Sequence, residues 1–328
     1  MVISGDIMQG ARIDAWIIAA VIAGFCPASA HSQDYPSRPI RIISAEPGGS
    51  GDRLTRMVVP GLASRLGQQV IVDNRGGASG IIAVETVVKA PADGYTLLSY
   101  GSIWILPLLR DDLSYDVLKD LAPITLKATS PNVLVVHPSL PVKSVKDLIA
   151  LSKARSGEIS YGTGGMGSSS HLTAELFKSM AGIRITGVPY KGFGQALTAL
   201  VGGEVQMAFG SAGSAAPLVK SGRLRALAVT SAKPTPLAPD LPTIAATLPG
   251  YESVYMLGVF APARTPPAVI NRLNQEIIRV LQTAEIKERF FNAGVDVVGS
   301  TPQELRSAME SEMAKLGKVI RDAGIRLN

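Results

Sequence analysis

The sequence predicts an α/β fold made of two domains. Its 328 residues suffice for two domains of roughly 100–200 residues each. Short apolar runs of strand length alternate with helical patterns, which is typical of a parallel sheet covered on both faces. Two glycine-rich loops, residues 47–52 and 161–172, each follow such a run and lead into a helix. Ligands of open α/β sheets bind outside the carboxyl ends of strands, so both loops are candidate binding elements.

The first third of the chain predicts strands and helices in alternation. Strands are expected at residues 40–43, 70–72 and 95–99. Apolar residues recur at four-residue spacing from Leu54 to Leu66, with Asp52 near the start and Gly67 after the end, as at helix termini. A second helix is expected through residues 82–88.

The middle of the chain predicts a second α/β unit. Two strand-like runs are expected between residues 123 and 138, around Ser130-Pro131-Asn132. The capping-box pattern of residues 144–147 predicts a helix that ends before Gly157. Beyond the second glycine-rich loop, a helix is expected at 194–200 and strands at 185–189, 207–209 and 224–229.

The C-terminal part predicts one more strand and two long helices. The strand is expected at residues 255–260, after a proline-rich connection. One helix follows Thr265 and carries apolar residues on one face. Thr301 to Glu304 forms a second capping box with proline at the first helical position.

The N-terminus has the pattern of a secretory signal peptide. Arg12 precedes an apolar run, residues 15–25, and Ala28-Ser29-Ala30 supplies a small-residue cleavage site. The alternative is a buried N-terminal helix. Cleavage after Ala30 would remove Cys26, the only cysteine, so the mature protein is expected in a bacterial periplasm without disulfides.

Composition argues against several function classes. The net charge is +6, but aromatic residues are only 5 % and no basic run is interleaved with them, so nucleic-acid binding is not expected. The three histidines, His31, His137 and His171, have no metal-ligand spacing. We therefore expect no metal, no cofactor and no enzymatic activity.

The second glycine-rich loop allows three interpretations. Gly162, Gly164 and Gly167 match a dinucleotide fingerprint, but residues 182–186 lack the acid that would hold a ribose. The glycines could also merely permit a tight turn. The third interpretation is a ligand loop, because serine hydroxyls and free N–H groups at a helix N-terminus bind anions.

Catalytic constellations are incomplete. Neither residues 49–52 nor residues 210–213 complete a Gly-x-Ser-x-Gly nucleophile elbow. His171 lies in the first turn of a helix, where a packed structural role is favoured over catalysis. Lys191, at a strand end, is either an anion ligand or a solvated lysine. We interpret the two glycine-rich loops as the two halves of a carboxylate-binding cleft.

Several segments together resemble one family. They are residues 35–40, 47–50, 90–98, 161–172, 188–192, 261–262 and 265–266. On these residues the chain resembles the Bug family of periplasmic solute-binding proteins, the receptors of tripartite tricarboxylate transporters. The resemblance implies a type II periplasmic-binding fold, with two α/β domains joined by crossing strands and a cleft between them. The expected domains are residues 31–130 with 253–328, and residues 131–252.

The resemblance also implies a ligand site made of main-chain amides and hydroxyls. The residues expected there are Gly48, Gly49, Ser50, Asp52, Ser102, Trp104, Thr163, Gly164, Ser168, Ser169, Tyr190, Lys191 and Ser211. Two departures from the family concern the ligand. Ser44-Ala45-Glu46 replaces a Pro-Phe pattern and brings an acid to the mouth, and Gly210-Ser211 replaces an aspartate. Trp104 is expected to restore the lost aromatic surface.

The function implied is capture of a small organic acid for delivery to the membrane subunits of a transporter, by a soluble monomer. One alternative is a sensory binding protein that reports a ligand to a signalling partner. An exported hydrolase is the other. Gene neighbourhood would separate transport from sensing, and a turnover assay on esters would test for the hydrolase.

Overall fold

The computed structural model describes residues 35–44, 47, 50–75 and 80–326. The chain divides into two units, residues 1–37 and 38–328, and the second contains every described helix and strand. The segment assigned to a signal peptide, Cys26 included, lies outside the described residues. The same holds for Glu46 in the first glycine-rich loop.

The first section of the sheet combines N-terminal and C-terminal strands. In order across the sheet they are β2 (Val70–Asn74), β1 (Ile40–Ser44), β3 (Thr96–Gly101), β9 (Val254–Pro262) and β4 (Leu121–Val136), with β10 (Asp296–Val297) also on β4. β1 is parallel to β2 and β3, whereas β9 is antiparallel to β3 and β4. The three predicted N-terminal strands are confirmed, and β9 completes the section from far along the chain.

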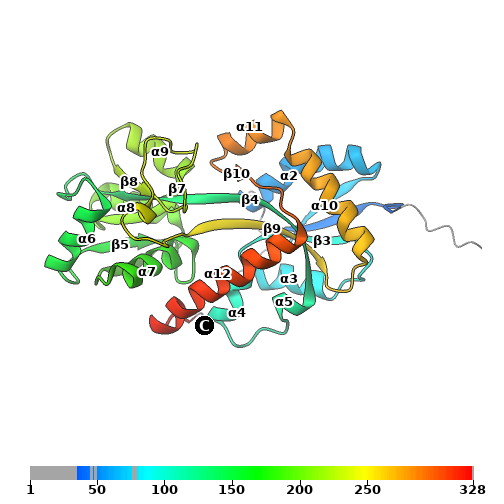
Figure 1. Cartoon of the computed structure of the whole chain (residues 1–328), viewed down its shortest axis with the longest axis horizontal. Helices are drawn as coiled ribbons and strands as arrows, with labels where there is room; N and C mark the ends of the chain where they lie inside the picture. The colour runs from blue at the N-terminus through cyan, green and yellow to red at the C-terminus, as the bar shows by residue number, and fades with distance from the viewer. Residues whose placement is uncertain (1–34, 45–46, 48–49, 76–79, 327–328) are drawn as a thin grey trace, which may run out of the picture. The chain divides into compact units, whose positions relative to one another are not determined.

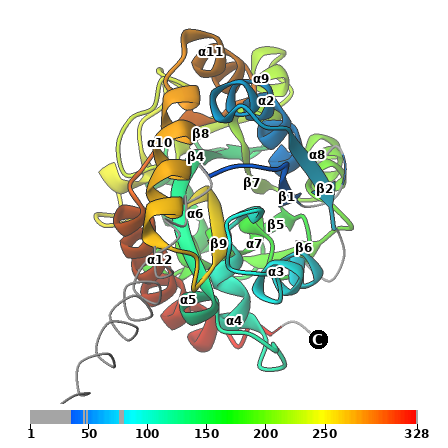
Figure 2. The ribbon, with the colours of Figure 1, turned by 90° about the vertical axis from the view of Figure 1, so that its right-hand side faces the viewer.

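Helices cover both faces of this section. α2 (Ser50–Leu66) and α10 (Pro267–Leu281) pack against each other (Figure 2), while α3 (Ile81–Val88) packs on β1, β3 and β9. Ile42 and Ile43, which are consecutive in β1 and point to opposite faces, are both buried. β1 is therefore enclosed on both faces, as its apolar run predicts, whereas β2 lies at the edge of the sheet.

The second section of the sheet is built from the middle of the chain. Its order is β6 (Thr186–Pro189), β5 (Ser160–Thr163), β7 (Met207–Ser211) and the end of β4, with β8 (Arg225–Val229) also on β4. Its helices are α6 (Val145–Ala154), α7 (Ser169–Ala181), α8 (Phe193–Gly202) and α9 (Ala212–Lys220). β5 is parallel to β6 and β7, so this section repeats the alternation of strands and helices.

One long strand links the two sections. β4 continues for 16 residues, so the prediction of two separate runs around Pro131 is wrong. Pro131 pairs with Val254 of β9, and the next residue, Asn132, pairs with Ser211 of β7. Proline has no N–H to donate to a ladder. It is tolerated here because the strand changes partners at this position, and β9 runs beside β4 on the first-section side (Figure 1).

The remaining elements complete the chain. They are the 3₁₀ turns η2 (Ile103–Ile105) and η3 (Ile244–Ala246), and helices α4 (Leu106–Leu109), α5 (Val117–Asp120), α11 (Ala284–Asn292) and α12 (Pro302–Asp322). The capping box of α12 is confirmed: the N–H of Glu304 donates to Thr301 Oγ1, and the N–H of Thr301 donates to Glu304 Oε2. α12 contacts β4, η2 and α4 as well as α7, so it touches elements of both sections.

Candidate functional site

Two cavities share the second glycine-rich loop, residues 161–172, which we name the glycine–serine segment. The small cavity has a volume of about 330 Å³ and the large cavity about 940 Å³. Gly164, Ser168, Ser169 and Tyr255 line both. A group bound at these four residues would therefore face both cavities.

The fold of the glycine–serine segment follows from its glycines and hydroxyls. Gly165 and Gly167 have positive φ angles of 116° and 72°, which favour glycine. Thr163 Oγ1 accepts the N–H of Gly165 at 3.0 Å and donates to its carbonyl oxygen at 3.1 Å. Ser168 has extended backbone angles and its Oγ accepts from the N–H of His171, so it caps α7. These local bonds set the start of the helix at the cavities.

Two amides at this helix start have no acceptor among the residues that the structure describes. Within the part of the chain that the structure describes, no group accepts a hydrogen bond from the N–H of Ser169 or Ser170. The N–H of Gly164, by contrast, is taken by Ser170 Oγ at 3.0 Å. The helix N-terminus carries a partial positive charge, so the Ser169 and Ser170 amides are the donors available to an anion.

A hydrogen-bonded network of mostly buried side chains supports the glycine–serine segment. The N–H of Gly167 donates to His171 Nδ1 at 3.1 Å, and His171 Nε2 lies 3.9 Å from Glu175 Oε1. Burial lowers the pKa of His171, which leaves Nδ1 free to accept at neutral pH. Glu175 also accepts bonds from Lys178 and from the hydroxyl of Tyr161. His171 thus supports the loop, in keeping with its expected structural role.

Tyr255 reaches both cavities because a glycine makes room for it. A Cβ atom on Gly101 would clash with the hydroxyl oxygen of Tyr255 and with its Cζ. The next residue, Ser102, has a φ of 45° and is the one non-glycine residue with positive φ in the described ranges. Its N–H donates to the carbonyl oxygen of Met256, which ties the end of β3 to β9. This corner places Ser102 in the small cavity and Tyr255 in both.

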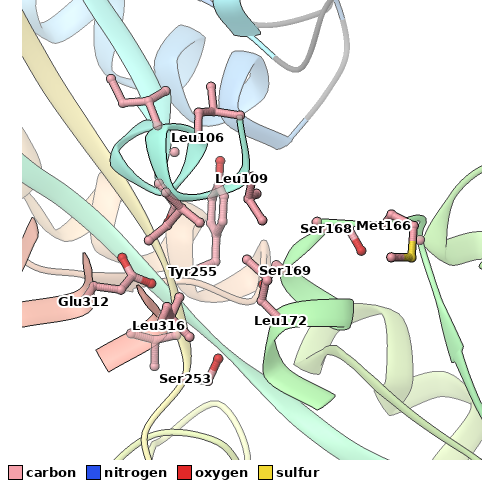
Figure 3. Close-up of a pocket in the computed structure, with 17 residues that line it drawn as sticks. Leu106, Leu109, Met166, Ser168, Ser169, Leu172, Ser253, Tyr255, Glu312 and Leu316 are labelled. Carbon is pink, nitrogen blue, oxygen red and sulfur yellow. The ribbon is translucent and has the colours of Figure 1, made fainter. Parts of the chain in front are cut away.

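The described lining of the small cavity is more apolar than polar and includes the acid Glu312 (Figure 3). Its apolar side chains are Ile103, Ile105, Leu106, Leu109, Met166, Leu172, Val254 and Leu316. Glu312 of α12 and Ser253 contribute polar groups. Burial raises the pKa of Glu312 to about 7. Such a lining favours a ligand with an apolar body and a polar end.

Trp104 does not supply an aromatic wall to either cavity. It is fully buried and packs edge-to-face against Phe260. Its Nε1 donates to Glu312 Oε2 at 2.6 Å, so it acts on the small cavity only through that acid. The expected aromatic surface comes instead from Tyr255 and from Phe193, which lines the large cavity. Gly210 is required there, because a Cβ at this position would collide with the Phe193 ring.

The large cavity has a largely apolar lining that also carries basic and amide side chains. Its described lining includes Arg53, Arg289, Asn132 and Asn292, and it contains no aspartate or glutamate. Arg289 pairs with Glu285 at 3.2 Å, whereas no described acid pairs with Arg53. Asn132 Nδ2 lies 3.4 Å from Ser169 Oγ, which links the crossing strand to the glycine–serine segment. This lining suits an anionic group.

The predicted site residues fall into three groups. Those that line a cavity are Ser102, Gly164, Ser168, Ser169 and Ser211. Those that line neither are Asp52, Trp104, Thr163, Tyr190 and Lys191. The backbones of Gly48 and Gly49 and the side chain of Ser50 lie outside the described residues. A binding role for any of them stays a prediction.

Among the residues that miss the cavities, Asp52 and Thr163 bond to other groups, and Lys191 faces solvent. Asp52 is buried, and its carboxylate accepts from Arg56 Nε at 3.0 Å and from Asn74 Nδ2 at 2.8 Å. The hydroxyl of Thr163 is used within its own loop. Lys191 is exposed, which corresponds to the solvated alternative considered for it.

Several cavity residues carry no signal in the sequence. Ser253, Tyr255, Arg289 and Glu312 stand in or beside elements whose apolar patterns indicate only packing.

Among the residues that the structure describes, no cluster of His, Cys, Asp or Glu could hold a metal ion. In the same ranges, no helix is long and apolar enough to cross a membrane.

Known proteins resemble this chain over most of its length. Residues 54–325 match a family model described as tripartite tricarboxylate transporter family receptor. Protein BugT of Bordetella pertussis (strain Tohama I) is 37 % identical over 322 residues, which cover 97 % of this chain and 98 % of BugT.

Solved structures resemble it as well. A protein of R. palustris solved with adipate is 38 % identical, with a TM-score of 0.75 over 89 % of this chain and 99 % of that one. MatC from Rhodopseudomonas palustris with bound malate is 27 % identical, with a TM-score of 0.71 over 87 % and 100 %. The type II fold, with two α/β domains joined by crossing strands, is thereby confirmed.

Proposed function

Because the chain belongs to the tripartite tricarboxylate transporter receptor family, we propose that it captures a small organic carboxylate in the periplasm and delivers it to the membrane subunits of such a transporter. The similar structures that hold adipate and malate, both carboxylates, support this assignment. A receptor role also favours binding without turnover.

The observation that carries the proposal is the pair of amides at the start of α7 for which the described residues offer no acceptor. We place the ligand carboxylate against the N–H groups of Ser169 and Ser170, with the Ser168 hydroxyl beside them. Oriented amides and the helix dipole stabilise a negative charge there. Asn132 and Arg53, which line the same large cavity, would add donors and positive potential.

Capture would require the two domains to close on the ligand. The proposed domains are residues 31–130 with 253–328, and residues 131–252. The hinge would lie where β4 changes partners at Pro131 and where the chain returns at β9. Closure of this kind excludes water and strengthens each charged hydrogen bond.

Export would require a leader, and we propose that residues 1–30 serve as one. The intact mass of protein recovered from the periplasm should correspond to a chain that begins at His31. A mature chain that keeps the apolar run would contradict this.

A proline substitution tests the amide site directly. Ser169 is the first residue of α7, where proline is tolerated because its missing N–H is not needed by the helix. Ser168 has a ψ of 160°, which suits a residue before proline. Ser169→Pro should weaken binding of a dicarboxylate such as adipate roughly 10- to 150-fold, the range for a hydrogen bond to a charged group.

Ser169→Ala is the matched control, because it removes the same hydroxyl and keeps the amide. Its affinity, measured by calorimetry, should stay much closer to that of the parent. Equal affinity of the proline and alanine variants would place the carboxylate elsewhere. A thermal-shift screen of mono-, di- and tricarboxylates selects the ligand, since a bound ligand raises the melting temperature.

A further inference from the structure

We propose that the small cavity selects carboxylates whose apolar chain ends in a hydrogen-bond donor, which Glu312 accepts. The inference rests on the proposed function, because it takes the carboxylate end to be bound at the glycine–serine segment. The inference adds the chemistry expected at the end of the ligand opposite this carboxylate. The ligand class is then an ω-hydroxy or ω-amino carboxylate rather than a short hydrophilic diacid.

The cavity has the geometry for such a ligand. Ser168 and Ser169 form part of its wall, so a chain that starts from a carboxylate at these residues can enter it. Leucine and isoleucine side chains from η2, α4, α7 and α12 line the path (Figure 3). At about 330 Å³ the space lies within the range of small-ligand pockets. Burying a methylene chain against these side chains is favourable.

Glu312 is held ready to accept a hydrogen bond. Trp104 Nε1 donates to its Oε2 at 2.6 Å, which fixes the carboxylate against a fully buried ring. Within the described residues no group donates to Oε1 of Glu312. Because an acceptor in an apolar surrounding gains from a partner, a hydroxyl or ammonium group on the ligand would complete this site.

The charges around Glu312 disfavour a ligand whose far end is anionic. Burial is the main cause that raises its pKa to about 7, and Glu252 raises the pKa further. The hydrogen bond from Trp104 and the charge of Lys315 lower the pKa. Lys315 itself pairs with Glu252 at 3.3 Å. Above pH 7 the acid is therefore ionised, and a second ligand carboxylate beside it would be repelled.

The large cavity offers the contrasting outcome. A diacid that turned its second carboxylate toward Arg53 and Arg289 would never meet Glu312. The two arrangements rank ligands in opposite order. If the chain enters the small cavity, a donor at its far end improves affinity and a carboxylate there weakens it. If the chain lies in the large cavity, the diacid binds best.

The test compares six-carbon ligands that differ only at the far end: hexanoate, 6-hydroxyhexanoate, 6-aminohexanoate and adipate. Calorimetry at about pH 8 on the parent should show the hydroxy and amino acids binding at least ~10-fold tighter than hexanoate and adipate. Lowering the pH to about 6 should protonate Glu312. Adipate should then gain affinity and 6-aminohexanoate should lose it.

Glu312→Gln supplies the second arm, because the amide oxygen can still accept from Trp104 while the charge is gone. It should reduce the preference for 6-aminohexanoate over hexanoate to under ~3-fold and improve adipate binding. Glu310→Gln, an exposed acid on the same helix, should leave all four affinities unchanged.

Two results would overturn the inference, and they differ. If adipate binds tightest at pH 8 and Glu312→Gln changes nothing, Glu312 is outside the site, while the receptor function stands. If none of the four carboxylates binds the parent, the proposed function fails together with the inference.

Discussion

A Gly164→Asp variant is expected to fold and to lose carboxylate binding. Gly164 lines both cavities, next to the Ser169 and Ser170 amides that we assign to the ligand. An aspartate here adds a negative charge against a bound anion, and like charges in contact cost several kcal/mol. A Cβ at this position would also lie 3.0 Å from the backbone nitrogen of Phe193, so the loop must shift slightly. Affinity measured by calorimetry should fall at least ~100-fold.

Gly164→Asn separates the two causes, because asparagine has the shape of aspartate without its charge. The asparagine variant should show the cost of crowding alone and bind more tightly than the aspartate variant. Circular dichroism and urea unfolding on both variants establish that each is folded. If the folded aspartate variant binds its ligand as tightly as the parent does, the glycine–serine segment is not the site.

A Lys127→Met variant is expected to be more stable than the parent at neutral pH. Lys127 lies on β4, is 2 % exposed, and places Nζ 2.9 Å from Thr55 Oγ1 and 3.0 Å from Ser99 Oγ. No described carboxylate pairs with it, so the ammonium form is poorly stabilised. Burial lowers its pKa from 10.5 to about 7. Methionine fills a similar volume without burying a charge.

The pH dependence has a definite sign. Between pH 7 and 10.5 the unfolded chain holds the lysine proton and the folded chain does not, so the free energy of unfolding rises with pH in this window. The difference between the two pKa values corresponds to a rise of roughly 5 kcal/mol in the free energy of unfolding. This rise is complete above pH 10.5 and has not begun below pH 7. Urea unfolding at several pH values should show this slope in the parent and lose it in Lys127→Met.

The gain at pH 7 should be about 2–5 kcal/mol, because methionine loses two hydrogen bonds but removes the burial cost. The hydroxyls of Thr55 and Ser99 keep a bond to each other at 2.9 Å. Lys287→Met, on the exposed face of α11, is the control and should leave the profile unchanged. A flat parent profile would show that Lys127 does not lose its proton on folding. A less stable Lys127→Met at pH 7 would show that burying the lysine costs less than its two hydrogen bonds contribute.

The sequence predicts features that depend on neighbouring residues. The capping box of α12 and the serine cap of α7 form within four residues of chain, and both are present in the structure. The alternation of strands and helices follows from the spacing of apolar residues, which also repeats within a few positions of the sequence. For this reason the fold class could be predicted and then confirmed.

Features that depend on distant partners could not be predicted in the same way. Asp52 stands beside a glycine-rich loop in sequence, yet Asn74 and Arg56 hold its carboxylate. Trp104 was expected at the ligand, but its partner Glu312 lies 208 residues away. Tyr255 reaches the cavities because Gly101, on another strand, leaves space for its ring. Such placements depend on packing between elements, which a local pattern does not contain.

The long strand β4 also has a consequence for the order of folding. Its C-terminal part pairs with β7 and β8, which follow within about a hundred residues, whereas its N-terminal part must wait for β9. β9 also closes the gap between β3 and β4, so the first section cannot complete its sheet until residue 254 is available. Contacts over long sequence separations form slowly. The middle of the chain can therefore become compact first and hold β4 in place as a template for the rest.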